Sequence, residues 1–160
     1  MAPSTAGSTW LAHARLDFPI RSPRLRLRLA LPEYASPAAF GRRDYRPYFE
    51  AQSVDVAIID TPWNGVAESV KIAAMADAYE VNVAPHNFYG HLATLMNAHF
   101  CAVVPNLRIM EIDPDVVPWY DELVTHTPDI KDGHLTLSSR PGWGTDVNEA
   151  AVRAHPPKKR

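Results

Sequence analysis

The sequence has little cysteine and no long apolar run. A single cysteine, Cys101, among 160 residues excludes a disulfide within the chain and is typical of a reducing compartment. No run approaches the roughly 18 apolar residues of a membrane span. The N-terminus also lacks the continuous apolar core of a secretory signal. These absences predict a cytoplasmic protein with no membrane partner.

An excess of charge of one sign is also absent from the chain as a whole. The formal net charge is −2 and 46% of the residues are hydrophobic, which is ordinary for a soluble protein. The charges are distributed unevenly, because residues 1–32 carry five arginines and one acid, whereas residues 33–160 carry 11 basic and 17 acidic residues. The arginines are not interleaved with aromatic residues and form no recognisable nucleic-acid motif, so we expect no nucleic-acid partner.

Residues 1–40 differ in composition from the rest of the chain. They contain clusters of Ser, Pro and Ala and the stretch RLRLRLAL at residues 24–31, whose period of two is that of a half-buried strand. The arginine-rich, acid-poor composition also fits an organelle transit peptide. Our preferred interpretation is an atypical extension that is disordered or non-native.

From residue 41 the apolar pattern predicts helices that alternate with strands. The stretch VDVAII at residues 54–59 is nearly continuous and β-branched, as in a parallel strand buried on both faces. The order of elements predicts a parallel α/β fold with right-handed crossovers. The chain is too short for a complete (β/α)8 barrel of about 250 residues. The expected strands are 54–59, 80–83 and 107–112, and the expected helices are 42–53, 66–79 and 90–104.

The last part of the chain breaks this alternation. Residues 114–124 contain two prolines and predict a loop with a helical turn. The stretches that follow predict a strand at 133–139, a turn at 140–144, and a helix at 146–156 with an Asp146 or Asn148 cap. Residues 156–160 predict a solvated tail.

Three polar residues stand at the ends of the three predicted strands. Asp60, His86 and Glu111 each follow an apolar run. The carboxyl ends of parallel strands face the ligand, so these side chains are candidates for one site. An Asp beside a His orients the imidazole and fixes its tautomer, and such a His can act as a general base or acid. A protonated carboxylic acid can donate to a developing enediolate.

Each of these residues also has a simpler interpretation. A strand-end Asp is more often a helix cap or turn residue, and a lone His is more often structural. Glu111 can form a surface ion pair. Their recurrence in three successive strand–helix units is the reason to predict a shared site.

Longer stretches carry a resemblance to a known family. VDVAIIDTPWNG, VAPHNFYGHLATLMNAHF, PNLRIMEID and GHLTLSSRPGWGTDVNEAAVRAH include the elements APHN and PGWG in order. The chain resembles the C-terminal barrel segment of the enolase superfamily, in the mandelate racemase and galactonate-type sugar-acid dehydratase branch. The resemblance implies an α/β fold, with residues 41–128 as the last three to four units of a partial (β/α)8 TIM-like barrel. Residues 129–160 would be a strand–helix segment that packs on a capping domain.

The resemblance also implies a chemistry and roles. Asp60 and His86 match a dyad that serves as general acid and base, and Glu111 matches a glutamate that stabilises the enolate. The family removes the proton alpha to a carboxylate with the help of Mg²⁺. We expect a sugar acid as substrate, and dehydration rather than racemisation. Asn87, Tyr89 and His91 would shape the substrate pocket, although we slightly prefer a plain helix-terminal role for His91.

Several family features have no match in this chain. The capping domain, the first four barrel strands and the carboxylates that bind the metal are missing, and Glu33 is a poor match for one of them. We therefore assign no metal ligand and expect the chain alone to be inactive. The alternative is a non-catalytic half-barrel whose open strand edges lead it to self-associate as a homo-oligomer.

Overall fold

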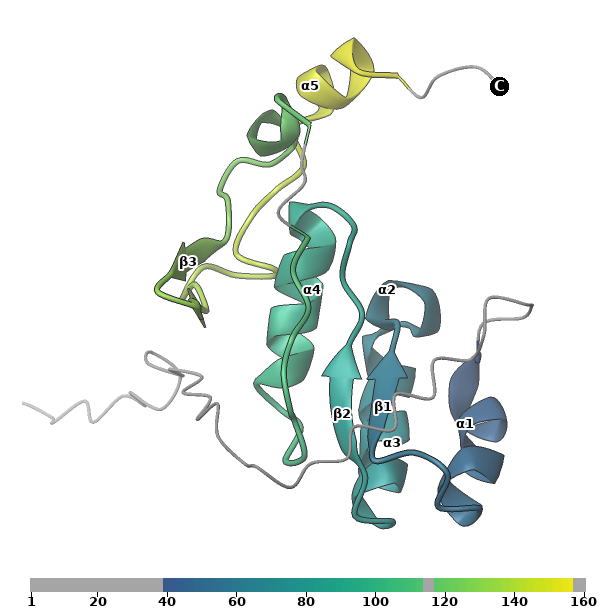
Figure 1. Ribbon diagram of the computed structural model, residues 1–160. Coiled ribbons are helices and arrows are strands. Elements are labelled where there is room, and N and C mark those ends of the chain that lie inside the picture. Colours follow the sequence, from purple (N-terminus) through teal and green to yellow (C-terminus); the bar gives the residue numbers. More distant parts are fainter. Residues whose placement is uncertain (1–38, 114–116, 157–160) are drawn as a thin grey trace, which may run out of the picture.

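A computed structural model describes residues 39–113 and 117–156 (Figure 1). The predictions for residues 1–38, including the strand at 24–31, lie outside the described residues. So does the prediction for the tail at 157–160. No helix in the described ranges is long and apolar enough to cross a membrane.

Two parallel strands form the centre of the fold. Strand β1 (Val56–Ile59) pairs with β2 (Asn82–Pro85), and the paired residues run from Val56 with Asn82 to Ile59 with Pro85. Both arrows in Figure 1 point to the same end of the sheet. The strand predicted at 80–83 begins two residues late, because the backbone N–H of Val81 still donates to the carbonyl of Ala76 in a helix-terminal turn.

Helices cover these strands and bury their apolar residues. The elements are α1 (Gly41–Glu50), α2 (Thr61–Asn64), α3 (Val66–Asp77) and α4 (His91–Cys101), and α1 packs on α3. The three long helices confirm the predicted ones with shorter bounds, and α2 forms in the connection between the elements predicted at 54–59 and 66–79. The core includes fully buried side chains from helices and strands alike: Phe49, Ile59, Ile72, Val83 and Phe100.

Residues 107–112 do not form a regular strand, so the prediction of a strand there is wrong. Only Leu107 forms a bridge with Val83, through one backbone hydrogen bond on each side. A regular parallel ladder would next need the backbone nitrogen of Pro85 to donate, and proline has no N–H. The segment still runs beside β2, since the N–H of Glu111 donates to the carbonyl of Pro85 at 3.3 Å.

The rest of the chain forms small local elements. These are the 3-10 helix η1 (Tyr120–Leu123), the strands β3 (Asp129–Lys131) and β4 (His134–Thr136), and helix α5 (Glu149–Ala154). The helical turn is confirmed, the predicted strand is shortened to β4, and its partner β3 was not predicted. Asn148 rather than Asp146 caps α5, because its side chain accepts from the N–H of Ala151.

Candidate active site

The register of the two strands places the predicted dyad. Ile59 pairs with Pro85 at the last position of the ladder, so Asp60 and His86 are the next residues on neighbouring strands. The N–H of His86 donates to the carbonyl of Ile59 at 2.9 Å, which continues the pairing for one more bond. Asp60 is also the N-cap of α2, where it leaves the sheet with a β-like backbone. Both side chains therefore lie at the carboxyl ends of the two strands.

Asp60 and His86 are in direct contact. Nδ1 of His86 lies 3.0 Å from Oδ2 of Asp60. An ionised carboxylate only accepts hydrogen bonds, so this contact requires the imidazole proton on Nδ1. The side chain of Asp60 is 19% exposed and that of His86 is 31% exposed, so the pair is partly shielded from water. Nε2 is thereby left as the basic nitrogen of the neutral ring.

Glu111 lies on the other side of the imidazole. Its Oε2 is 3.7 Å from Nε2 of His86, and its side chain is 52% exposed. The backbone bond from Glu111 to Pro85 brings the carboxylate to the end of β2 even though no regular strand forms there. The three predicted residues are thus brought together, with His86 between the two carboxylates.

Asn87 holds Glu111 in place. Its backbone N–H donates to Oε2 of Glu111 at 2.9 Å, and its side-chain Nδ2 donates to the Glu111 carbonyl at 3.1 Å and to Oγ1 of Thr94 at 2.9 Å. Asn87 is 1% exposed, so these contacts are sheltered. They show the side chain engaged inside the protein, and its predicted contact with substrate stays a prediction.

Tyr89 contacts the dyad. Its hydroxyl donates to Oδ2 of Asp60 at 2.5 Å, and its ring meets the ring of His86 edge-on with centroids 5.8 Å apart. Its predicted substrate contact also stays a prediction.

His91 is the first residue of α4, and its Nε2 lies 2.6 Å from Oδ1 of Asp121. This is a helix-terminal position with a carboxylate partner. Neither of the two roles considered for His91 is tested by this geometry.

Two residues at this site were missed by sequence reasoning. The hydroxyl of Tyr120 donates to the backbone carbonyl of Tyr89 at 2.5 Å, and Asp121 pairs with His91. Burial, together with the charges of Asp113 and Asp121, raises the pKa of Tyr120, so its hydroxyl stays protonated as a donor. About 30 residues of chain separate these partners, and no local pattern in the sequence indicates such a contact.

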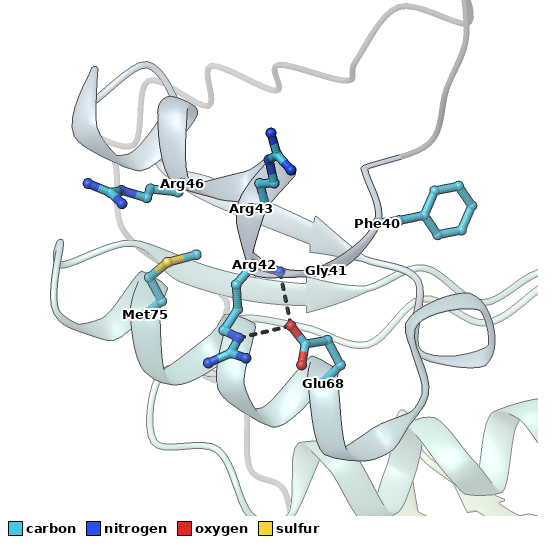
Figure 2. Close-up of a pocket in the computed structure, with 7 residues that line it drawn as sticks. All are labelled: Phe40, Gly41, Arg42, Arg43, Arg46, Glu68 and Met75. Carbon is cyan, nitrogen blue, oxygen red and sulfur yellow. Dashed lines mark hydrogen bonds and ion pairs between the residues drawn. The ribbon is translucent and has the colours of Figure 1, made fainter.

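A hollow of about 490 Å³ lies elsewhere, between α1 and α3 (Figure 2). Its lining includes Arg42, Arg43 and Arg46 and none of the dyad residues. Arg42 donates to Glu68, and hydrogen bonds from Arg42 lower the pKa of that carboxyl group. The three guanidinium groups point in different directions in Figure 2, so they do not converge on one ligand.

Comparison with known proteins identifies the family. The model of the enolase C-terminal domain-like family matches residues 8–151. The chain belongs to this family. The match begins within the segment that we expected to be an extension, and the boundary at residue 40 stays a prediction.

Relatives within the enolase superfamily include sugar-acid dehydratases. The chain is 32% identical over 134 residues to a D-xylonate dehydratase from Haloferax volcanii, covering 80% of this chain and 32% of that protein. It is 33% identical over 138 residues to a D-galactonate dehydratase from Ralstonia pickettii, covering 81% of this chain and 36% of that protein. The chain therefore spans about a third of the length of these relatives.

A solved structure of a candidate L-alanine-DL-glutamate epimerase from Burkholderia xenovorans is similar to this chain. That protein was bound to magnesium and fumarate. The TM-score is 0.72 and the identity 62%, over 74% of this chain and 30% of that one. Dehydratases and an epimerase-like protein thus both occur among the relatives of this enolase-family chain.

The described residues do not fit a magnesium ion. Mg²⁺ prefers an octahedron of oxygen ligands, usually with one or two carboxylates. Within residues 39–113 and 117–156, no group of three His, Cys, Asp or Glu side chains could hold a metal. The two carboxylates of the site lie on opposite nitrogens of His86, and Oδ2 of Asp60 already contacts two donors. We therefore derive no step through magnesium in this chain.

Proposed function

We propose that this chain supplies the acid–base part of an enolase-superfamily active site that acts on a sugar acid. The observation that carries the proposal is the row of Asp60, His86 and Glu111 at one edge of the sheet. The names of the dehydratases at 32% and 33% identity support dehydration, whereas the name of the 62%-identical solved structure supports epimerisation, and we propose dehydration. We further propose that residues 41–128 are the last three to four units of a partial barrel, and that residues 129–160 pack on a capping domain.

The dyad suits proton transfer at carbon. Asp60 keeps the imidazole proton on Nδ1, so Nε2 of His86 is free to accept the proton alpha to a substrate carboxylate. Asp60 then stabilises the imidazolium that forms. In a dehydration, the same Nε2–H gives its proton to the departing hydroxyl group, which leaves as water. Glu111, in its protonated form, can donate to the enediolate oxygen from the other side of the ring.

The chain alone is proposed to lack turnover. Loss of the alpha proton leaves negative charge on the substrate carboxylate, and the described residues provide no metal site to stabilise it. Turnover of galactonate, xylonate or another sugar acid by the purified 160-residue chain with Mg²⁺ would contradict this part of the proposal.

A hybrid protein tests the dyad in a complete barrel. The Burkholderia relative is 62% identical over 74% of this chain, so in the hybrid its matching third is replaced by residues 41–151. We expect the hybrid to exchange the alpha proton of at least one sugar acid in heavy water, followed by proton NMR. His86→Asn should lower that exchange by at least about a hundredfold, the usual contribution of a general acid–base residue.

A matched control separates chemistry from folding. His126 is exposed and lies outside the site, and its Nδ1 contacts Oγ1 of the neighbouring Thr125. His126→Asn in the same hybrid should leave the exchange rate unchanged. Equal rates in the hybrid and in its His86→Asn variant, with both proteins folded, would contradict the role of the dyad.

The second candidate is a non-catalytic half-barrel that associates with itself. Among the described residues β1 pairs with β2 alone, and an unpaired parallel edge favours pairing with another chain. Sedimentation of the purified chain distinguishes the two, since this candidate predicts a dimer or larger species at micromolar concentration. A monomer at that concentration would contradict self-association.

A further inference from the structure

One carboxylate oxygen contacts two donors at the candidate active site. Oδ2 of Asp60 lies 3.0 Å from Nδ1 of His86 and 2.5 Å from the hydroxyl of Tyr89. The other oxygen, Oδ1, is buried and has no hydrogen-bond partner within the described residues. The orientation of the carboxylate is thus determined by its one engaged oxygen.

Tyr89 is itself held by the C-terminal part of the chain. Tyr120 in η1 donates to the backbone carbonyl of Tyr89 at 2.5 Å, and the ring of Phe88 stacks on that of Tyr89 with centroids 4.7 Å apart. The edge-on contact with His86 limits the ring from another side. These contacts hold the ring so that its hydroxyl oxygen stays within hydrogen-bond distance of Oδ2 of Asp60.

We propose that Tyr89 is a positioning residue for the acid–base dyad. Its hydroxyl fixes the rotation of the Asp60 carboxylate, so that Oδ2 faces Nδ1 of His86 and keeps the imidazole in the Nδ1–H tautomer. The inference rests on the proposed function of the dyad and deepens it. It gives Tyr89 a role through Asp60, in place of the direct contact with substrate that the sequence predicts.

The physical argument is a competition between two tautomers. A free neutral imidazole has no partner that selects either nitrogen, whereas a fixed carboxylate at Nδ1 selects the Nδ1–H form. Without the tyrosine hydroxyl, the carboxylate can rotate, so that Oδ2 is no longer held opposite Nδ1 and the unpartnered Oδ1 can accept hydrogen bonds. The selection at Nδ1 then weakens, and Nε2 is less often the free nitrogen that accepts a proton.

The test measures the tautomer of His86 directly. The full chain labelled with ¹⁵N-histidine gives ring nitrogen shifts that report which nitrogen carries the proton, at a pH where the ring is neutral. We expect the Nδ1–H form to predominate in the unmodified chain and to fall in Tyr89→Phe, which keeps the aromatic ring. Tyr48→Phe is the control, since Tyr48 is an exposed tyrosine on α1.

Asp60→Ala separates the inference from the function on which it rests. If Asp60→Ala changes the tautomer ratio and Tyr89→Phe leaves it as in the unmodified chain, the dyad stands and the inference is wrong. If Asp60→Ala also changes nothing, Asp60 does not set the tautomer, and both the dyad and the inference are contradicted.

A second measurement needs no variant. The Tyr89 hydroxyl proton and the His86 Nδ1 proton both point at Oδ2, so they should show a nuclear Overhauser effect in the unmodified chain. Presence of this effect supports the inference if Tyr89→Phe fails to fold. Absence of the effect, with both protons observed, contradicts it.

Discussion

Cys101 should react extremely slowly with thiol reagents in the folded chain. It is the only cysteine, lies at the end of α4, and is 2% exposed. Burial raises the pKa of its thiol from 9.0 to about 12. The perturbation is the addition of a disulfide reagent at pH 8. The reagent has one target in this chain, and that thiol is protonated and buried.

The size of the effect follows from two independent routes. The thiolate is the reacting species, and raising the pKa from 9.0 to about 12 lowers its population at pH 8 by roughly a thousandfold. Reaction through unfolding is also slow, since a domain stable by about 5 kcal/mol is unfolded less than about one part in a thousand. Both routes predict a rate at least about a thousandfold below that of the chain in urea.

The assay is the release of thionitrobenzoate, followed by absorbance with and without denaturing urea. A matched control places the thiol two residues further on, as Val103→Cys in a Cys101→Ala background, because Val103 is 64% exposed. That thiol should react within about tenfold of the rate of an unfolded chain. A native rate for Cys101 within tenfold of its rate in urea would refute the burial of Cys101 in the hydrophobic core.

Three further predictions concern stability. Gly144→Ala should destabilise the chain by more than Gly133→Ala in urea melts. Gly144 and Gly133 both have positive φ, +80° and +76°, but only at Gly144 would a Cβ lie 2.7 Å from Cβ of Ser138. Equal losses of unfolding free energy in the two variants would contradict this packing. Asn106→Leu should cost about 1–3 kcal/mol, because Nδ2 of Asn106 donates to the buried carbonyls of Ala73 and Val81; a loss below about 0.5 kcal/mol would mean that these bonds add nothing. Burial, with the charge of Asp60, raises the pKa of Tyr45 from 10.0 to about 12. The pKa of Tyr45 is higher in the folded chain than in the unfolded chain. The contribution of its neutral phenol to the free energy of unfolding is therefore complete below pH 10 and is lost as the pH rises towards 12. The stability difference between the unmodified chain and Tyr45→Phe should therefore shrink over that range, and a constant difference would contradict it.

The alternation of α1, β1, α3, β2 and α4 could be predicted from the sequence. The continuous β-branched run before Asp60 and the helical spacing in α3 and α4 are local patterns, and the structure confirms the elements they predict. The cap of α5 is local too, because an Asn side chain reaches an N–H only three residues away. Such elements can be predicted because residues close in sequence determine their backbone geometry.

Two of the failures have separate physical causes. The strand expected at 107–112 reads as a strand in isolation, but its ladder requires a donor at Pro85, more than twenty residues earlier. Residues 80 and 81 read as the start of a strand and instead close the turn after α3. In the first case a partner far along the chain decides how the backbone groups are satisfied, and in the second case the end of the previous helix decides it.

At the candidate site, too, some features follow from local sequence and others from contacts between distant segments. The sequence by itself determined that Asp60, His86 and Glu111 follow successive apolar runs, and that parallel strands would bring their ends together. Only the tertiary structure decided that Oδ2 of Asp60 contacts both Nδ1 of His86 and the hydroxyl of Tyr89. Only the tertiary structure decided that Tyr120, 31 residues away, holds Tyr89. Strand periodicity determines which residues reach an edge, whereas the packing of distant segments determines which atoms meet there.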